Sequence, residues 1–364
     1  MKKIKAALLG CTGLVGQQFI RLLDDHPFFE LACLTASSGS AGRTCAAALA
    51  DASATIAHAA TLALVIRETT AAEIIRSRAR VVFSALPAAA AGPLEAELRA
   101  AGLRVFSNAG AHRMDASVPL LIPEVNPGHL ELCRAQLRDH EGFIVTNPNC
   151  VVAGLALALK PLTALGLRAV TVTTFQAVSG GGRRGVAAWD TLGNIVPFIA
   201  GEEEKIVRET GKILGELAGD HVAGSPIEIF PSCCRVPVRE GHLQSVSAEF
   251  DRPVSSGEIR EALAGFAAEP QQLKLPTAPA APIIVRDEAD RPQPFLDVQA
   301  GETGPVVAGR HGRARGMAVS VGRLRPRGRR CDLFLLLHNT VRGAAGGSVL
   351  NAELAASKGL IPGR

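Results

Sequence analysis

The first third of the chain alternates between short apolar runs and amphipathic stretches. Ile4–Leu9 is a β-type run, residues 10–16 are rich in glycine, and apolar residues recur at helical spacing between Val15 and Leu23. Residues 31–36 then have the composition of a second buried strand. This order predicts a β-α-β unit in which the two strands run parallel.

The same alternation continues towards the middle of the chain. Further β-type runs at residues 81–84 and 105–108 are separated by a helix-like stretch around residues 93–101. Strands that alternate with helices are typical of a parallel, doubly wound sheet, so we expect a Rossmann-type α/β domain.

The pattern changes after Asn149. Longer β-type runs are mixed with a long charged helix, expected over residues 202–217, and this mixture predicts a second domain of the α+β class. The longest of these runs lie at residues 169–175, 243–250 and 331–337. A chain of 364 residues also exceeds the size of one ordinary core. We expect one domain over residues 1–148, completed by a C-terminal helix at about 340–364, and a second over residues 149–339.

Composition narrows the classes of function. Lys plus Arg number 39 against 34 Asp plus Glu, and this excess is dispersed except for a cluster between Arg323 and Arg330, which favours a small anionic ligand over nucleic acid. No apolar run reaches membrane-spanning length, and no signal-peptide pattern is present. The eight cysteines show neither CxxC pairs nor zinc spacing, so we expect no metal site and a reducing cytoplasm.

Three glycines, Gly10, Gly13 and Gly16, stand between the first predicted strand and the first predicted helix. A phosphate-binding loop lies at this place in dinucleotide-binding folds, because glycines let the backbone approach a pyrophosphate and free amides at the helix end meet its charge. The spacing is GxxGxxG rather than GxGxxG, so a tight turn without a ligand is the alternative.

The end of the second predicted strand bears on the choice of nucleotide. NAD-binding folds place an acidic residue there, on the ribose hydroxyls, whereas this chain has Ser37, Ser38 and Arg43. Hydroxyls and a guanidinium suit a 2′-phosphate, which predicts NADP. A solvated polar loop is the alternative.

A candidate nucleophile, Cys150, precedes an apolar helical run over residues 151–159. Asn149 is a plausible N-cap, which would place Cys150 in the first helical turn, where free amides and the helix dipole lower the pKa of a thiol. An inert buried cysteine is the alternative.

A catalytic thiolate also needs an acid or base, and His242 is the candidate, although a lone histidine is more often structural. Arg235 precedes it by seven residues, and alternation along a strand would point Arg235, Pro237 and Arg239 in the same direction. Glu202 opens the long predicted helix, where an acidic residue is favourable for structural reasons alone.

These segments, in this order, closely resemble the aspartate-semialdehyde dehydrogenase family, specifically its archaeal and fungal branch. The match extends nearly from end to end. Besides the segments above, it includes Val81-Val-Phe-Ser84-Ala-Leu-Pro87, Arg113-Met-Asp, Val118-Pro-Leu-Leu-Ile-Pro-Glu-Val-Asn126, Asp290-Arg-Pro-Gln-Pro294 and His338-Asn339-Thr-Val-Arg-Gly343-Ala-Ala-Gly346.

The resemblance implies roles for the candidate residues. It implies a nucleophile, an acid/base and a residue that orients the acyl intermediate, which are Cys150, His242 and Gln176. It implies four substrate contacts: Arg235 to the α-carboxylate, Glu202 to the amino group, and Arg113 and Lys205 to the acyl phosphate. With the loop residues argued above, the expected cofactor contacts are Gly10, Thr12, Gly13, Leu14, Val15, Ser37, Ser38, Arg43, Ser84, Ser179, Gly180 and Asn339.

The activity implied by the resemblance is the NADPH-dependent reductive dephosphorylation of L-aspartyl 4-phosphate to L-aspartate 4-semialdehyde, a step in the biosynthesis of lysine, threonine and methionine. It would proceed through a thioester on Cys150, which divides one difficult step into two easier ones. The expected partners are the acyl phosphate, inorganic phosphate and further copies of this chain, as a homodimer or homotetramer built through the second domain.

Several positions depart from the family pattern. Val151 and Val152 replace small hydroxyl residues after the nucleophile, Phe295 stands where a basic residue is common, and Leu337 replaces a frequent glycine. These departures leave room for a malonyl-coenzyme-A reductase of the same branch, or for a non-catalytic NADP-binding regulator. N-acetyl-glutamyl-phosphate reductase is less favoured, because glycine usually stands there in place of Asn149.

Overall fold

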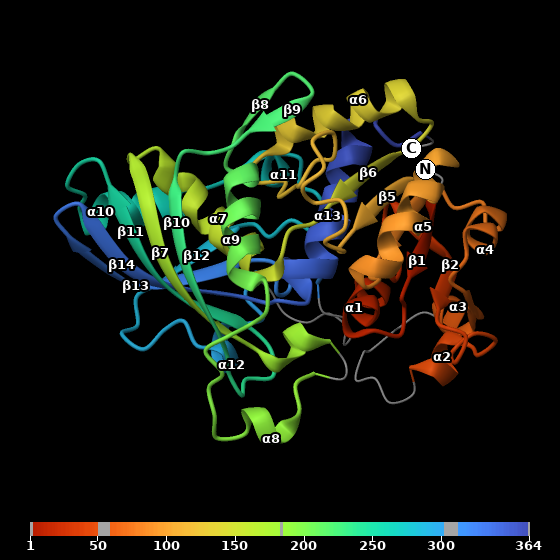
Figure 1. Ribbon diagram of the computed structural model, residues 1–364, viewed down its shortest axis with the longest axis horizontal. Coiled ribbons are helices and arrows are strands. Elements are labelled where there is room, and N and C mark those ends of the chain that lie inside the picture. The colour runs from red at the N-terminus through yellow and green to blue at the C-terminus, as the bar shows by residue number, and fades with distance from the viewer. Residues whose placement is uncertain (1–2, 50–58, 183–184, 302–311, 363–364) are drawn as a thin grey trace.

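Six short strands from the first half of the chain form a parallel sheet. The structure is a computed structural model that describes residues 3–49, 59–182, 185–301 and 312–362. The strand order is β3-β2-β1-β4-β5-β6, and the sheet lies on the right in Figure 1. The strands are β1 (Ile4–Leu9), β2 (Phe29–Ala36), β3 (Ile66–Glu68), β4 (Val81–Ser84), β5 (Arg104–Ser107) and β6 (Phe143–Thr146).

Helices cover both faces of this sheet, which explains why strands such as β4 and β6 are buried along their whole length. The main helices around it are α1 (Leu14–Leu23), α4 (Ala71–Arg76), α5 (Ala88–Ala100), α6 (Glu131–Asp139) and α13 (Gly346–Ser357). Shorter pieces are α2 (Cys45–Ala48), α3 (Ala59–Ala63) and the 3₁₀ turn η1 (Pro127–Leu130).

The register of the first sheet brings the carboxyl ends of its central strands to one level. Leu9 pairs with Ser84, Ser84 with Ser107, and Ser107 with Thr146. The residues that follow these strands therefore meet at one edge of the sheet, where ligands bind in open α/β sheets.

A second, mixed six-stranded sheet has the order β10-β7-β11-β14-β13-β12. Its strands are β7 (Leu167–Gln176), β10 (Glu228–Arg235), β11 (His242–Phe250), β12 (Ile283–Arg286), β13 (Val319–Arg327) and β14 (Arg330–Leu337). The helices of this half are α7 (Cys150–Thr163), α8 (Ala188–Thr191), α9 (Glu202–Ile213), α10 (Ser256–Ala264), α11 (Glu269–Gln272) and α12 (Pro294–Asp297). The 3₁₀ turn η2 (Val178–Gly181) and the hairpin β8 (Glu216–Ala218) and β9 (His221–Ala223) complete it.

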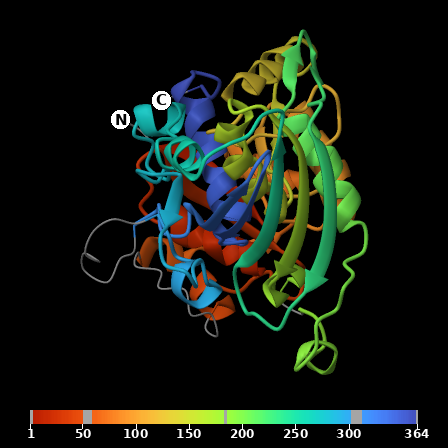
Figure 2. The ribbon, with the colours of Figure 1, turned by 90° about the vertical axis from the view of Figure 1, so that its left-hand side faces the viewer.

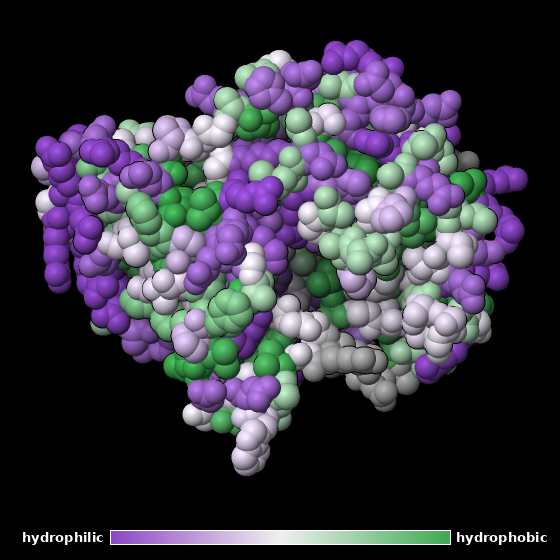
Figure 3. Space-filling model, in the orientation of Figure 1, coloured by the Kyte–Doolittle hydropathy of each residue, from purple (hydrophilic) through white to green (hydrophobic). Residues whose placement is uncertain are grey.

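The two faces of the second sheet differ. Along β11 every second residue is buried and the residues between them are partly exposed, so one face packs against α7 and α10. Figure 2 looks towards the other face, with the green strands nearest the viewer. Exposed apolar side chains also gather in and after α8, namely Trp189, Leu192, Ile195 and Phe198. In Figure 3 the lowest part of the molecule shows green atoms among white and purple ones, with larger green groups just above it.

The chain returns to the first sheet at its end. The π-helix η3 (Val341–Ala345) leads into α13, which packs against α1 and β5 and is buried over nearly its whole length. The expected α/β plus α+β architecture is confirmed. The exact domain boundaries stay a prediction.

Two local expectations were wrong. The helix expected over residues 202–217 ends at Ile213, because the β8–β9 hairpin closes against it: a Cβ on Gly215 would lie 2.2 Å from the carbonyl oxygen of Ala223. Strand β10 ends at Arg235, so Pro237 and Arg239 do not continue its alternation.

Candidate active site

Cys150 is the first residue of α7 and lies between the two sheets. Asn149 is the N-cap, as predicted: its side-chain oxygen accepts a hydrogen bond of 2.8 Å from the amide of Val151. The turn is tightly enclosed, because a Cβ on Gly343 would lie 2.7 Å from the Cβ of Cys150. Glycine at position 343 therefore lets the π-helix η3 pass directly over the thiol.

His242 begins β11 and faces this cysteine. Its Nε2 lies 3.1 Å from Sγ of Cys150, although 92 positions separate the two residues. The amide N–H of Ala177 donates to Nδ1 over 3.1 Å. Because Nδ1 accepts this hydrogen bond, the neutral ring carries its proton on Nε2, where it points at the sulfur.

The protonation of this pair differs from the expectation for a helix end. Burial, together with the negative charge of Glu202, raises the pKa of Cys150 to about 12, whereas the positive charge of Arg113 works in the opposite direction. Burial and the charge of Arg235 lower the pKa of His242 to about 3. The pair is thus a neutral thiol beside a neutral imidazole, and the predicted lowering of the thiol pKa was wrong.

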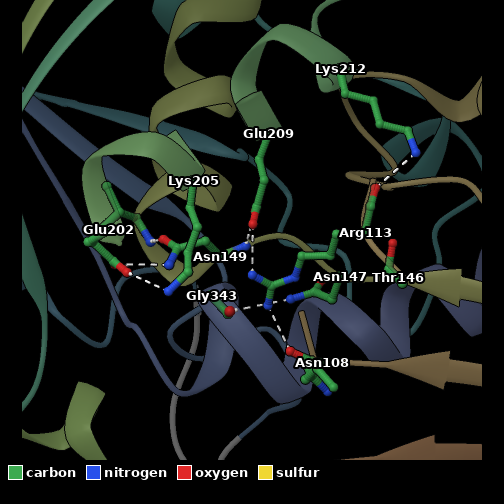
Figure 4. Close-up of polar contacts among 12 residues, drawn as sticks. Asn108, Arg113, Thr146, Asn147, Asn149, Glu202, Lys205, Glu209, Lys212 and Gly343 are labelled. Carbon is green, nitrogen blue, oxygen red and sulfur yellow. Dashed lines mark hydrogen bonds and ion pairs between the residues drawn. The ribbon is translucent and has the colours of Figure 1, made fainter. Parts of the chain in front are cut away.

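Helix α9 and the loop after β5 surround the first turn of α7 with charges (Figure 4). Glu202 accepts a hydrogen bond of 2.9 Å from the side-chain amide of Asn149 and lies 3.6 Å from Nζ of Lys205. Arg113 forms an ion pair of 2.9 Å with Glu209 and donates to the carbonyl oxygen of Asn108. Arg113, Glu202 and Lys205 thus come together, as the expected substrate contacts require.

A second group of candidate residues meets on the other side of His242: Arg235, Ser179, Gly180 and Asn339. Nη1 of Arg235 donates to the carbonyl oxygen of Ala177, and a Cβ on Gly180 would lie 2.8 Å from this nitrogen. Asn339 donates to Oγ of Ser179 over 2.8 Å and accepts from the amide of Gly241. These contacts fix the glycine turn η2 beside the imidazole.

Gln176 ends β7 next to this turn. Its side chain is buried and donates to Oγ1 of Thr174 over 3.2 Å. The backbone of Gln176 thus directs Ala177 towards His242, while its side chain lies along the strand.

The glycine loop has the geometry of a nucleotide cradle. Gly10 has a φ of 75°, and a Cβ there would lie 2.8 Å from the carbonyl oxygen of Ala85; a Cβ on Gly16 would lie 2.2 Å from the carbonyl oxygen of Gly10. No side chain caps α1 at Gly13. The backbone of residues 12–15, which include Thr12, Leu14 and Val15, therefore forms an uncapped helix end of the kind that binds a pyrophosphate.

Nearby polar groups could also serve a nucleotide. Oγ of Ser84, at the end of β4, is buried without a hydrogen-bond partner. Ser37, Ser38 and Arg43 follow β2 and are exposed, and Arg43 contacts the carbonyl oxygen of Ala47. They lie on a surface loop rather than in the enclosed site.

The positions that depart from the family pattern are either packed in the core or exposed to solvent. Val151 and Val152 are fully buried in the core of the second sheet, and Phe295 is 93% exposed. Leu337 packs over Gly154, where a Cβ would lie 2.7 Å from the leucine side chain. Among the residues that the structure describes, no helix is long and apolar enough to cross a membrane and no metal-ligating cluster occurs.

Two family models cover most of the chain. The model for the semialdehyde dehydrogenase NAD-binding domain matches residues 5–133, and the model for the dimerisation domain matches residues 159–342. The chain belongs to the semialdehyde dehydrogenase family. The predicted resemblance is therefore confirmed.

Individual relatives agree with this assignment. The chain is 43% identical to the aspartate-semialdehyde dehydrogenase of Archaeoglobus fulgidus, over 99% of this chain and 100% of that protein. It is also 37% identical to the malonyl-CoA reductase (NADP) of Metallosphaera sedula, over 100% of this chain and 99% of that protein. The crystal structure of the Candida albicans aspartate-semialdehyde dehydrogenase with NADP matches with a TM-score of 0.86 and 37% identity, covering 98% of this chain and 100% of that one.

Sequence reasoning missed three residues of this semialdehyde dehydrogenase site: Glu209, Lys212 and Gly343. Glu209 and Lys212 continue the helical spacing that Glu202 and Lys205 begin, which is the signal that could have revealed them. The role of Gly343 depends on a contact between distant segments and has no local signal.

Proposed function

We propose that this protein is an NADP-dependent aspartate-semialdehyde dehydrogenase that reduces L-aspartyl 4-phosphate through a thioester on Cys150. The contact that carries the proposal is the 3.1 Å approach of His242 Nε2 to Cys150 Sγ, at the start of α7 and between two groups of cationic side chains. Membership of the family and the nucleotide cradle support the same activity. A non-catalytic regulator would have no use for a thiol paired with an imidazole in this setting.

The substrate is placed by charge. Arg235 pairs with the α-carboxylate through its planar fork, and Glu202 accepts hydrogen bonds from the amino group. Arg113 and Lys205 hold the acyl phosphate on the opposite side of the thiol. Their ion pairs with Glu209 and Glu202 hold these two cations in position, so the dianionic phosphate meets positive charge that is already oriented.

The chemistry proceeds at Sγ. The proton of the Cys150 thiol passes to the departing phosphate as Sγ attacks the acyl carbon, and the phosphate leaves with the electron pair of the broken C–O bond. Nε2–H of His242 donates to the sulfur and stabilises the negative charge that develops on it. In this proposal Gln176 orients the acyl group, as the family resemblance implies. Bound NADPH supplies the hydride that reduces the thioester. Collapse of the hemithioacetal breaks the C–S bond, releases the aldehyde and returns the sulfur as a thiolate, which again accepts a hydrogen bond from Nε2–H of His242.

The nucleotide fits the cradle described above. In this proposal residues 10–15 hold the pyrophosphate, the nicotinamide end is contacted by Ser84, Ser179, Gly180 and Asn339, and the 2′-phosphate is bound by Ser37, Ser38 and Arg43. We propose that the protein works in the cytoplasm as a homodimer or homotetramer through its dimerisation domain. The described cysteines, all free, are consistent with a reducing compartment.

Substrate comparison tests the proposal. NADPH oxidation should be fast with L-aspartyl 4-phosphate and slower by at least about tenfold in kcat/KM with malonyl-coenzyme A, since only the amino acid uses both Glu202 and Arg235. The reverse assay, with aldehyde, phosphate and NADP, should show Lys205→Met with a raised KM for phosphate. A preference for malonyl-coenzyme A would instead assign the malonyl-CoA reductase activity of the Metallosphaera relative.

A further inference from the structure

Lys212 makes contacts that substrate binding and the thiol chemistry do not explain. It is the penultimate residue of α9, and its side chain is 8% exposed. Its Nζ donates to three backbone carbonyl oxygens, those of Arg113 at 2.9 Å, Asp115 at 2.8 Å and Val118 at 2.8 Å. An ammonium group has three N–H donors, so these carbonyls use its whole capacity.

The three carbonyls belong to the loop that carries Arg113. This loop follows β5 and has no regular secondary structure between residues 108 and 118. Its other anchor is His112, whose ring nitrogens contact Asp115 and the carbonyl oxygen of Gly92 in α5. Lys212 therefore ties the loop to α9, as Figure 4 shows on its right-hand side.

Glu209 holds the same arginine by its side chain. One carboxylate oxygen lies 2.9 Å from Nη1 of Arg113, and the other accepts a hydrogen bond of 2.6 Å from the amide of Asn149, directly before Cys150. A single carboxylate thus sets the separation between the arginine of the proposed phosphate site and the turn that carries the nucleophile.

Helix α9 therefore presents a row of four charged residues along one face. Glu202, Lys205, Glu209 and Lys212 follow at intervals of three, four and three residues, which is the spacing of one helical face. The first two lie beside Asn149 at the proposed substrate site. The last two face Arg113 and Asn149 (Figure 4).

We propose that Lys212 and Glu209 are positioning residues that fix Arg113 relative to Cys150, so that the leaving phosphate is held at a fixed distance from the attacking sulfur. This inference rests on the proposed function, in which Arg113 binds the phosphate. Lys212 sets the backbone position of Arg113, and Glu209 sets both its side chain and its distance to the nucleophile. A misplacement of about 1 Å at such a site is enough to reduce the rate about a hundredfold.

The two residues should have separable effects in the reverse assay with inorganic phosphate as the probe. Lys212→Met should raise the KM for phosphate by at least about tenfold and leave the Kd for NADP within about twofold, because the loop moves while the nucleotide cradle does not. Lys212→Arg should recover most of the affinity, since it keeps the charge and the donors. Glu209→Gln should change both the KM for phosphate and kcat, because the amide has one acceptor oxygen in place of two and no negative charge to pair with Arg113.

Two controls separate this inference from a loss of folding and from a failure of the proposed function. Lys358→Met removes a surface lysine paired with Glu269 and should leave the KM for phosphate unchanged. If Lys205→Met also leaves it unchanged, the phosphate site itself is misassigned and the proposed function fails. If Lys205→Met raises the KM for phosphate but a folded Lys212→Met variant does not, the positioning role of Lys212 is overturned and the proposed function stands. Should Lys212→Met not fold, Lys212→Gln, which keeps two donors, must show a smaller rise in the same KM, and an unchanged value overturns the role.

Discussion

The thiol of Cys150 and the imidazole of His242 are in contact and both uncharged. Burial favours the neutral form of both groups, and the amide of Ala177 holds the imidazole with its proton towards the sulfur. In the proposed mechanism the thiolate therefore forms only as Sγ attacks the bound substrate, and we expect Cys150 to react slowly with other electrophiles.

Replacement of the two residues should give different losses. Cys150→Ser should abolish turnover, because a serine hydroxyl lacks the nucleophilicity of a thiolate. His242→Asn should leave a slow reaction, lowered by about 10²–10⁴-fold, since charge placement survives the loss of the imidazole. Mass spectrometry after incubation with the acyl phosphate, without NADPH, should find one acyl group on the Cys150 peptide. Acylation of Cys233 or Cys234 instead would show that the nucleophile is misassigned.

Gly343 offers a test of the close packing over the thiol. In Gly343→Ala the new methyl group would lie 2.7 Å from the Cβ of Cys150, so the first turn of α7 must shift. We expect kcat to fall by at least about tenfold. Gly211→Ala is the matched control, because a Cβ there meets no atom within 4 Å and alanine favours the helix. Equal kcat values for both variants and the wild type would contradict the packing argument.

At the scale of elements, periodicity predicted those strands and helices that carry several sequence signals within a few residues. The β1-α1-β2 unit, the end of β4 and the start of α7 were all visible because glycine, capping and apolar signals coincide within a few residues. Three features were not visible. The short edge strand β3 carries one buried residue, the arginine-rich β13 follows no apolar pattern at its exposed end, and the π-helix η3 depends on tertiary packing.

Some features of the candidate site could likewise be predicted from the sequence, and others could not. The residue types and the order of Cys150, Arg235 and His242 could be predicted, whereas the protonation of the thiol could not, because it depends on burial by segments distant in the sequence. Helical spacing places Lys212 on the same face as Glu202 and Lys205, but its three acceptors are backbone carbonyls of a distant loop, and no side-chain pattern predicts those contacts.

The loop between β2 and α2 supplies a prediction about cofactor choice. Ser37, Ser38 and Arg43 are exposed there and no acidic side chain follows the strand, so NADPH should exceed NADH in kcat/KM by at least about tenfold, equivalent to about 1.4 kcal/mol. Arg43→Ala should narrow that ratio by raising the KM for NADPH only. Steady-state kinetics with both nucleotides decides, and an equal rate with NADH would exclude the assigned role of the loop.

At the scale of the whole molecule, the two sheets are joined by the C-terminal segment. Arg342 in η3 is almost completely buried and forms a bidentate pair with Glu124, both contacts being 2.7 Å. Glu353 in α13 accepts hydrogen bonds from Thr277 and lies 2.8 Å from the ring of His26. Buried polar groups thus connect the first sheet, the C-terminal helix and the loop before β12, and these connections make stability sensitive to protonation.

Four buried histidines should make the enzyme lose stability at pH values well above those at which carboxylates titrate. Burial lowers the pKa of His242 and His338 to about 3 and also lowers the pKa of His26 and His129. In the unfolded chain each histidine has a pKa of about 6.5, so below that pH the unfolded state binds more protons than the folded state. The stabilisation is complete above pH 6.5 and is lost as the pH falls towards 3, at up to about 1.4 kcal/mol per pH unit for each residue.

Urea unfolding at pH 7 and pH 5 measures this loss directly. We expect the free energy of unfolding to fall by at least about 2 kcal/mol between these pH values, the amount that one fully buried neutral histidine contributes over 1.5 units below its unfolded pKa. His338→Asn should reduce the pH dependence, because asparagine fills a similar place without titrating. His221→Asn, in the exposed β8–β9 hairpin, should keep the wild-type pH dependence. If the wild type is as stable at pH 5 as at pH 7, the histidines are not held neutral in the folded enzyme, and the neutral Cys150–His242 pair inferred from the same burial must be abandoned with them.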